Sequence, residues 1–445
     1  MKFFETIKNI WKIEELKNRI MITFGLLLVY RFGTQVVLPG IDASQLADLA
    51  NQTDGGLLGL LKAFTGGAFS NASIFALGIM PYISASIVVQ LMGIAVPYLQ
   101  KLQKEGESGR KKINQITRWL TIAITLVQGP GYIYNLFATL PDSAFLLGDS
   151  VSFVVSSVII LTTGCIFAMW LGERITDKGI GNGISLLIMV GIIATLPQAF
   201  LQEIQSRVTE SNGGLIMILI ELAIWFVIIF ASVMLVMAVR QIPVQYARRN
   251  ATGGYEKNIF GGARQFIPLK LNASGVMPII FAQAIMFIPA AVAGLSDSEM
   301  AQGVTAAFNN IFGFWYNLVF ALLIIIFTYF YTAITVPTNK MADDLKRSGG
   351  FIPGIRPGTE TGEYLDRIMS QITLPGSVFL ALIAIFPAIV VSLGVQQGWA
   401  LFFGGTSLLI MVGVAIDTIQ QVNSYLLNRH YDGLMKSGKN RKAVA

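Results

Sequence analysis

Residues able to carry out chemistry at a catalytic or metal site are scarce in this sequence. The only histidine, His430, lies close to the C-terminus, no H-E-x-x-H motif is present, and no two aspartates fall on facing apolar segments. These absences exclude a zinc site and a Ser/His pair. No G-x-x-x-x-G-K-[ST] loop is present either, so the chain binds no nucleotide by itself. We therefore expect a protein that is not an enzyme and that needs no cofactor or metal.

Ionisable residues are equally rare within the apolar segments. Transporters and pumps bury such residues near the middle of the membrane, and the candidates here are Arg31, Glu221 and Asp417. Glu221 lies toward the outer end of its segment, and Asp417 lies toward the inner end of its own. An inverted-repeat solute transporter stays open as the alternative function, and a membrane scaffold without a pathway is a third.

Two short motifs occur twice, in the same order. G-I-M-P-Y-I at 78–83 returns as G-V-M-P-I-I at 275–280, and S-L-L-I-M-V-G occupies both 185–191 and 407–413. An identical heptapeptide and a matched hexapeptide in the same order indicate an internal repeat, in which the two halves of the chain share one design.

Each hexapeptide carries a proline within an apolar run. Proline damages a helix interior because it lacks an N–H group and clashes with the preceding turn. Such a residue is tolerated in a membrane where the freed backbone groups face a cavity or neighbouring helices. We expect Pro81 and Pro278 to bend two helices that face a shared interior.

The composition places the chain in a membrane. Hydrophobic residues make up 54% and charged residues 13% of the sequence, and the mean hydropathy is +0.64, whereas soluble domains carry about 25% charged residues. A membrane-spanning helix needs about 17–25 apolar residues. Ten segments qualify, namely residues 20–38, 72–98, 119–140, 151–171, 180–200, 215–240, 273–293, 313–336, 372–393 and 399–420. Residues 1–19 are charged and amphipathic, so we expect no cleavable signal.

Basic residues fall in alternate segments. Of 32 Lys and Arg residues, 29 lie at the two termini or in every second connecting segment. Only Lys62 and Arg207 lie in the other set, and Arg31 lies within the first span. Because basic segments stay in the cytoplasm, we expect both termini to be cytoplasmic.

The repeated motifs lie on spans two and five and again on spans seven and ten, so each half has five spans. Since five is odd, the second half enters the membrane from the opposite side and forms an inverted repeat. We predict an all-α integral membrane protein of ten transmembrane helices in two inverted halves, residues 1–212 and 213–445. The second half carries two long cytoplasmic loops, at 240–272 and 337–371, and a basic C-terminal tail.

The motifs place isoleucine, rather than a charged side chain, at the shared interior. Isoleucines four residues apart share one helix face, and the second half supplies symmetry mates. The six are Ile79, Ile83, Ile184, Ile188, Ile280 and Ile410. Any one of them alone would be ordinary packing, but together they could form an apolar constriction that gates by excluding water.

A short apolar segment at 57–69, L-L-G-L-L-K-A-F-T-G-G-A-F, leads directly into the first proline motif. It is too short to span and lies outside by the charge rule, so it is either re-entrant or an amphipathic helix on the outer surface. Its short tether to the helix of Pro81 favours a re-entrant stopper. Its large apolar side chains are Leu57, Leu58, Leu60, Leu61, Phe64 and Phe69.

The chain resembles the SecY family, the central subunits of protein-conducting translocation channels, over essentially its whole length. The blocks that carry the resemblance are A-L-G-I-M-P-Y-I-S-A-S-I at 76–87, K-E-G-E-S-G-R at 104–110, G-E-R-I-T-D-K-G-I-G-N-G-I-S at 172–185, I-P-L-K-L-N at 267–272, P-G-I-R-P-G at 353–358 and F-G-G-T-S-L-L-I at 403–410. The resemblance implies a central hourglass pore between the halves, hinged between spans five and six. It makes the six isoleucines the pore ring and residues 57–69 the plug.

The resemblance also implies a lateral gate, formed by spans two, three, seven and eight, that opens toward lipid. The gate candidates are Ser84, Ile87, Gln90, Gln283 and Phe287. The implied partners are the small subunits SecE and SecG, the SecA motor ATPase, the ribosome through rRNA and protein at its exit site, secretory preproteins with their signal sequences, and membrane lipid.

In that family the two long cytoplasmic loops dock the ribosome or SecA. The candidates for this contact are Arg356, in P-G-I-R-P-G, and Arg248 and Arg249, in Y-A-R-R; a planar guanidinium suits phosphate or carboxylate. The tip of the first loop departs from the family pattern, because it is rich in glycine and carries Glu256 where a tight basic tip is common. No further contact residues can be assigned there.

Together these features predict a channel in the bacterial cytoplasmic membrane. It would translocate unfolded secretory polypeptides across that membrane and insert transmembrane helices laterally into it. The energy would come from a partner, since the chain carries no nucleotide-binding loop.

Overall fold

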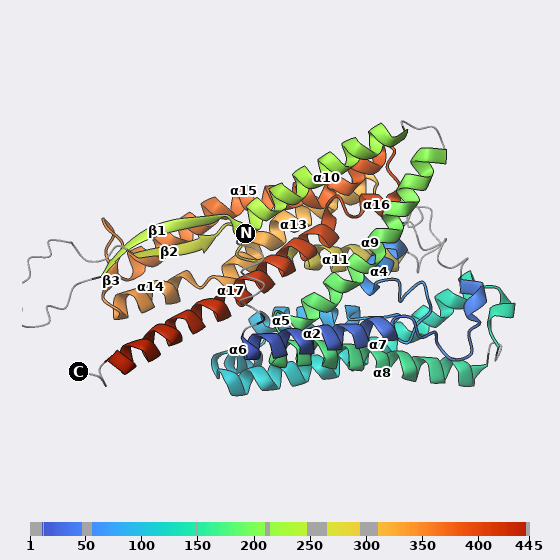
Figure 1. Ribbon diagram of the computed structural model, residues 1–445, viewed down its shortest axis with the longest axis horizontal. Helices are drawn as coiled ribbons and strands as arrows, with labels where there is room; N and C mark the ends of the chain where they lie inside the picture. Colours follow the sequence, from blue (N-terminus) through green and yellow to red (C-terminus); the bar gives the residue numbers. More distant parts are fainter. Residues whose placement is uncertain are drawn as a thin grey trace, which may run out of the picture. The chain divides into compact units, whose positions relative to one another are not determined.

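The computed structural model describes residues 11, 13–46, 56–146, 150–209, 214–246, 265–293 and 310–441 (Figure 1). The chain divides into two compact units. The first comprises Met1–Met217, Gly394–Phe402 and Gly413–Ala445, and the second comprises Ile218–Leu393 and Phe403–Val412. The chain therefore passes from one unit to the other within two of its helices, α10 (Gly214–Met237) and α17 (Gly405–Arg441).

The first unit is helical. Its helices are α2 (Glu14–Gly33), α4 (Gly56–Thr65), α5 (Met80–Ala95), α6 (Pro97–Lys104), α7 (Glu107–Thr139), α8 (Val151–Lys178), α9 (Gly183–Thr209) and α16 (Gln397–Ala400), with 3-10 turns at Ala43–Gln45 and Asp142–Ala144. Within this unit α7 packs on both α5 and α8, and α9 packs on α4, α8 and α16. The helix α9 thus carries Ile184 and Ile188 and packs on α4, which contains part of the predicted plug.

The second unit combines helices with a small sheet. Its elements are α11 (Met277–Ala293), α13 (Phe314–Thr335), α14 (Thr338–Arg347), α15 (Thr359–Ser392), β1 (Val239–Tyr246), β2 (Gln265–Lys270) and β3 (Gly350–Phe351). The long helix α15 packs on α13 and α14, and α11 packs on α13.

A helix lies in each of the ten predicted apolar segments. Within the described residues, six helices are individually long and apolar enough to cross a bilayer, or seven if the bent pair α5 and α6 counts as one span. These two helices meet at 101°, because Pro97 starts α6 and cannot donate an N–H to continue α5. The chain is thus a mostly helical, multi-pass membrane protein.

The expectation that Pro81 and Pro278 bend their helices is wrong. Each proline is the second residue of its helix, α5 or α11. Proline is tolerated there because N–H groups of the first turn have no partner within the helix, and its φ is already helical. Gly78 and Gly275, three residues earlier, have φ of 54° and 64°. The repeated hexapeptide is therefore a helix-start signal, in which glycine turns the chain and proline begins the helix.

The residues between α4 and α5 belong to the core of the first unit. Phe69 is buried with Tyr132 and Phe153 in one apolar cluster. The Tyr132 hydroxyl donates to the Phe69 carbonyl oxygen at 2.8 Å, and the two rings meet edge to face with centroids 5.0 Å apart. The predicted span at 72–98 is therefore helical only from Met80 onward, since the residues before it are fixed by packing on α7.

The prediction of an all-α protein is wrong for the two long connecting segments of the second half, which together form a small three-stranded sheet. Strands β1 and β2 are antiparallel, with Ile242 opposite Ile267, and β1 also pairs with β3. In V-R-Q-I-P-V-Q-Y the alternate residues Ile242 and Val244 are buried, as period-two side-chain alternation requires. They pack with Leu345 of α14 and with the first turns of α15.

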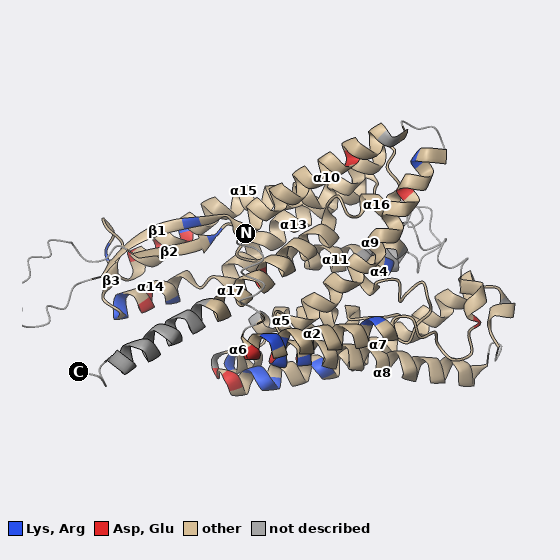
Figure 2. Ribbon diagram, viewed as in Figure 1, with Lys and Arg blue, Asp and Glu red and all other residues tan. Residues whose placement is uncertain are grey.

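Charged residues gather mostly at one end of the helices in each unit (Figure 2). In the first unit they lie on α6 and the adjacent ends of α2, α7 and α8, where Arg118 pairs with Glu173 at 2.6 Å. In the second unit they lie around the sheet and α14. The helices carry few charged residues away from these ends, among them Arg31, Glu203 and Arg207, in keeping with the cost of a charge in a bilayer core.

Candidate functional site

Four of the six isoleucines lie in the first unit, on two helices. Ile79 caps the start of α5, and its carbonyl oxygen accepts the Ile83 N–H at 3.0 Å, which places these two side chains one turn apart. Ile184 and Ile188 are one turn apart in α9. Ile79 and Ile188 are buried, and Ile83 and Ile184 are partly exposed.

The start of α9 is fixed by the glycine-rich block at 172–185. A Cβ added at Gly183 would lie 2.0 Å from the carbonyl oxygen of Gly172, so no side chain fits at that crossing of α8 and α9. The Gly183 N–H donates to Thr176 Oγ1 at 2.9 Å. The Gly181 N–H donates to Gln421 Oε1 at 2.8 Å, which ties the turn to α17. These contacts set the position of Ile184 and Ile188.

The other two isoleucines lie in the second unit. Ile410 is 3% exposed in the first turns of α17, and Ile280 is partly exposed in α11. The start of α17 lies close to α15, because a Cβ added at Gly404 would lie 2.3 Å from the Ile383 carbonyl oxygen. Each unit thus presents members of the predicted ring near the start of a helix.

Part of the predicted plug forms the short helix α4. Leu61 is partly exposed and packs against the cluster around Tyr132, while Phe64 and Phe69 are 8% and 7% exposed. The side chains of Leu57, Leu58 and Leu60 lie outside the described residues. The described part of this segment is therefore docked within the first unit.

The end of α4 is a glycine-terminated turn seated on α9. The Gly67 N–H donates to the Lys62 carbonyl oxygen at 2.9 Å and the Gly66 N–H to that of Ala63 at 3.3 Å, which is the Schellman pattern of a helix C-terminus. Gly66 has a φ of 65°, and a Cβ added to it would lie 2.8 Å from the Cα of Gly191 in α9. The backbones of α4 and α9 therefore touch through two glycines.

The lateral-gate candidates are split between the units. In α5, Ile87 is 8% exposed, Ser84 is partly exposed, and Gln90 donates from Nε2 to Ser86 Oγ at 3.2 Å. In α11, Gln283 is 5% exposed, and the side chain of Phe287 lies outside the described residues. A role in a gate remains a prediction for all of these residues.

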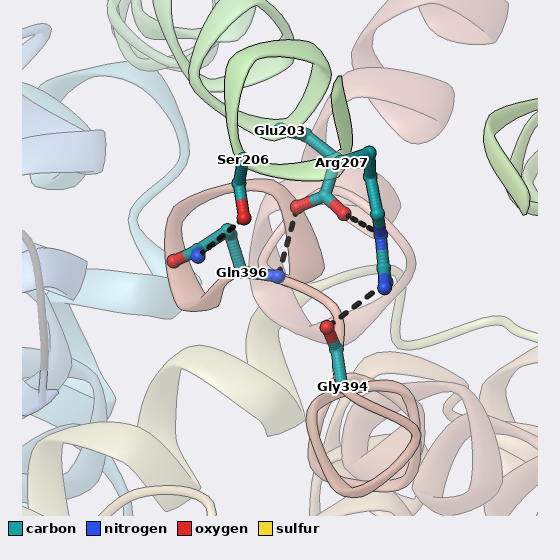
Figure 3. A network of polar contacts seen from close by, with 5 residues as sticks. All are labelled: Glu203, Ser206, Arg207, Gly394 and Gln396. Atoms are coloured by element: carbon teal, nitrogen blue, oxygen red, sulfur yellow. Dashed lines mark hydrogen bonds and ion pairs between the residues drawn. The ribbon is translucent and has the colours of Figure 1, made fainter. Parts of the chain in front are cut away.

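A buried polar network on α9 was missed by the sequence reading (Figure 3). Arg207 donates from Nε to Glu203 Oε1 at 2.7 Å and from Nη2 to the Gly394 carbonyl oxygen at 2.9 Å. The Gln396 N–H donates to Glu203 Oε2 at 2.9 Å, and Gln396 Nε2 donates to Ser206 Oγ at 3.0 Å. The only available signal was the i, i+4 spacing of Glu203 and Arg207, which is more often a surface pair.

The network holds a short stretch of chain beside α4, the helix that contains part of the predicted plug. Trp399 of α16 is 2% exposed and packs on Phe200 of α9, with ring centroids 5.0 Å apart. A cavity of about 40 Å³ is lined by residues of α4, α9 and the α16 region, among them Ala63, Ala199 and Phe402. The segment 394–402 thus forms one wall of the seat of α4.

Of the three arginines predicted to contact a cytoplasmic partner, the structure describes Arg356. Arg356 stands in a turn after β3 with its side chain 87% exposed, and its Nη1 lies 3.8 Å from Glu360 Oε1. The Arg356 carbonyl oxygen accepts the Thr361 hydroxyl at 2.8 Å, which fixes the turn to the start of α15. Arg248 and Arg249 lie outside the described residues.

Comparison with known proteins identifies the family. The SecY family model matches residues 73–419. The chain is 40% identical over 443 residues to a protein translocase subunit SecY of Streptomyces scabiei, covering 96% of this chain and 98% of that one. It is 39% identical over 445 residues to the corresponding subunit of Thermotoga maritima, covering 98% and 99%.

Solved structures share the fold. One, described as showing that the plug domain of SecY stabilises the closed state of the translocation channel and maintains a membrane seal, matches with a TM-score of 0.62 at 17% identity, over 92% of each chain. Sec61 in a canine ribosome–channel complex matches with a TM-score of 0.54 at 16% identity, again over 92% of each chain. By its sequence, over nearly its full length, the chain belongs to the SecY family.

Proposed function

We propose that this chain is the pore-forming subunit of a protein-conducting channel. It translocates unfolded secretory polypeptides across the bacterial cytoplasmic membrane and releases transmembrane helices laterally into it. The observation that carries the proposal is the seating of α4, a helix too short to span, against α9, the helix that bears Ile184 and Ile188. A stopper held against a helix of the constriction is what a resting channel needs.

The proposed topology has ten spans in two inverted halves, residues 1–212 and 213–445, with both termini in the cytoplasm. Support comes from the helix found in each predicted segment and from the charges gathered at one end of each unit's helices. The repeated helix-start motif, with positive φ at Gly78 and Gly275 and proline three residues later, supports a common design of the two halves.

The six isoleucines form the proposed pore ring. An apolar collar lets side chains of any chemistry pass, because it offers none of them a hydrogen bond or counter-charge. It also holds back ions, since a narrow apolar throat excludes water. The described parts of α5 and α11 and the first turns of α9 and α17, which carry the ring, contain no charged residue, and this supports a conduit rather than an ion-binding site.

The lateral gate and the cytoplasmic contacts complete the proposal. Ser84, Ile87, Gln90, Gln283 and Phe287 line the gate, through which signal sequences reach lipid. The partners are SecE, SecG, the SecA motor and the ribosome, and the described cytoplasmic contact is Arg356. A ribosome partner is supported by the Sec61 fold match, because that channel was solved in a ribosome complex, and by the exposure of Arg356.

Reconstitution tests the function. The chain would be co-purified with its small subunits, placed in lipid vesicles, and supplied with SecA, ATP and a radiolabelled preprotein. We expect protease-protected preprotein that depends on both ATP and an intact signal sequence. Uptake of a small solute in the absence of SecA, with no protected preprotein, would support the solute transporter instead.

A further inference from the structure

Arg31 is the only charged residue of α2 after Arg19, and the channel function leaves it unexplained. Its side chain is partly buried. From Nη1 it donates to the carbonyl oxygen of Gly66 at 2.6 Å and to Thr34 Oγ1 at 3.3 Å. The Thr34 hydroxyl, which is buried, donates back to the Arg31 carbonyl oxygen at 2.7 Å. Thr34 thus helps to aim the guanidinium at Gly66.

The Gly66 carbonyl is a favourable acceptor for a cation. It belongs to the turn that ends α4, and the C-terminus of a helix carries partial negative charge on its unpaired carbonyl groups. A hydrogen bond from a charged donor to such a group is shorter and stronger than a neutral one. The contact uses backbone on the α4 side, so it does not depend on the side chains of the plug.

The same point is where α4 touches α9. A Cβ at Gly191 would lie 2.9 Å from the Phe64 carbonyl oxygen and 3.2 Å from the Gly66 nitrogen. A Cβ at Gly66 would lie 3.2 Å from Arg31 Nη1. Three helices, α2, α4 and α9, therefore meet within van der Waals distance of one glycine, and the guanidinium of Arg31 closes the junction.

We propose that Arg31 is a latch that holds the plug helix α4 in its seat on α9. Arg31 is a positioning residue: it touches no substrate and acts through the plug. The second acceptor of the guanidinium, Thr34 Oγ1, belongs to α2 and its C-cap rather than to α4, so it would stay within reach of Arg31 if α4 left its seat. This inference rests on the proposed role of α4 as a plug. One measurement tests seating, that is, whether Arg31 holds α4 on α9, and a second tests sealing, that is, whether α4 closes the pore.

Seating is measured by thiol labelling. Cys165 is the only cysteine, so a Cys165→Ser, Ala63→Cys chain carries one thiol, at a position in α4 that is 5% exposed. We expect Arg31→Met to raise the rate of labelling by a water-soluble maleimide about tenfold, since one charge-assisted hydrogen bond to the seated state is lost. Arg31→Lys keeps the charge, loses the guanidinium geometry, and should give an intermediate rate.

The matched control is Arg19→Met. Arg19 is on the same helix and also donates to a backbone carbonyl at a helix end, from Nη1 to Gly179 at 3.3 Å. Its other described partners are Glu15 and Tyr425 rather than residues of α4. Its labelling rate should equal that of the parent chain. Equal rates for Arg31→Met, Arg31→Lys and Arg19→Met would overturn the latch.

Sealing is measured as ion leak in planar bilayers, on chains with position 63 unchanged. Arg31→Met should raise the resting leak, and it should add nothing in a chain lacking residues 57–65, because the latch then has nothing to hold. A leak that rises equally in both backgrounds would overturn the latch. Faster labelling with no leak in either Arg31→Met or the deletion would keep the latch but contradict the plug.

Discussion

Glu203 and Arg207 form an ion pair one turn apart in α9, and both side chains are buried, at 1% and 6% exposure. Each partner also bonds to the backbone of another segment: Glu203 accepts from the Gln396 N–H, and Arg207 donates to the Gly394 carbonyl oxygen. The pair therefore fastens the link between α15 and α16 onto α9, beside α4.

Removing one partner of this pair should be costly. Arg207→Ala leaves a buried carboxylate without its counter-charge, which typically costs about 3–5 kcal/mol. We expect a clear fall in the thermal unfolding midpoint of the detergent-solubilised protein. Lys111→Ala is the control, because its i, i+4 pair with Glu107 is 77% and 85% exposed and such pairs contribute under about 1 kcal/mol. Equal midpoints for the two variants would refute the fastening role.

Deleting the plug helix should leave a folded but leakier channel. Removal of residues 57–65 takes away most of α4 and spares Phe69, whose carbonyl and ring are held by Tyr132. Single-channel recording should show a higher resting conductance, modest in size if neighbouring chain partly fills the seat. Removal of residues 57–69 should leak at least as much but also lower stability. If the shorter deletion is as tight as the parent chain, α4 is not the stopper.

Polar substitution of the ring should favour the hydrated, open state. Ile83→Asn and Ile280→Asn are the cleanest tests, because these side chains are only partly buried and an amide there disturbs packing least. We expect higher resting ion conductance and easier export of proteins with defective signal sequences, while Ile83→Leu and Ile280→Leu stay near parent values. Ile133→Asn, at a position 1% exposed in α7, should lower stability without raising conductance. Identical behaviour of the Asn and Leu variants would make these isoleucines ordinary packing.

Reversing the charge of Arg356 should weaken contact with a cytoplasmic partner. Its side chain is 87% exposed, so Arg356→Glu should leave the channel folded in the membrane while lowering SecA-driven translocation. The defect should depend on salt, because exposed charge contacts are screened within about 8–10 Å at physiological ionic strength. Arg367→Glu, an equally drastic change at an exposed position of α15, is the control. Normal translocation by Arg356→Glu would remove it from the contact surface.

The sequence predicted the family and the helical membrane architecture because both depend on properties that local residues carry. The length of an apolar run determines where a helix can cross a bilayer. The sequence blocks shared with the SecY family identify the family along the chain. The plug role of residues 57–69 stays a prediction. The structure shows that α4, which begins in this short apolar run, packs on α9 within the first unit.

Features that depend on tertiary contact were not predicted. The role of Pro81 was misjudged because a proline at the start of a helix and one in its middle look alike until the helix boundary is known. Strands β1 and β2 are short and separated by residues 247–264, so their pairing could not be read locally. The burial of Glu203 and Arg207 depends on residues 394–396, almost 200 positions away in the chain, and spacing alone cannot reveal it.

The most direct test of a protein-conducting pore is contact between the ring and a chain in transit. A photo-crosslinking residue would be placed at Ile83, at Ile410 or, as control, at Phe226, which is 63% exposed on the outer face of α10. A secretory preprotein fused to a tightly folded domain would be stalled in the channel by SecA and ATP. A pore lined by the ring should give crosslinks from positions 83 and 410 to the mid-region of the stalled chain, and none from position 226. Crosslinks absent from both ring positions while the preprotein is demonstrably stalled would contradict such a pore.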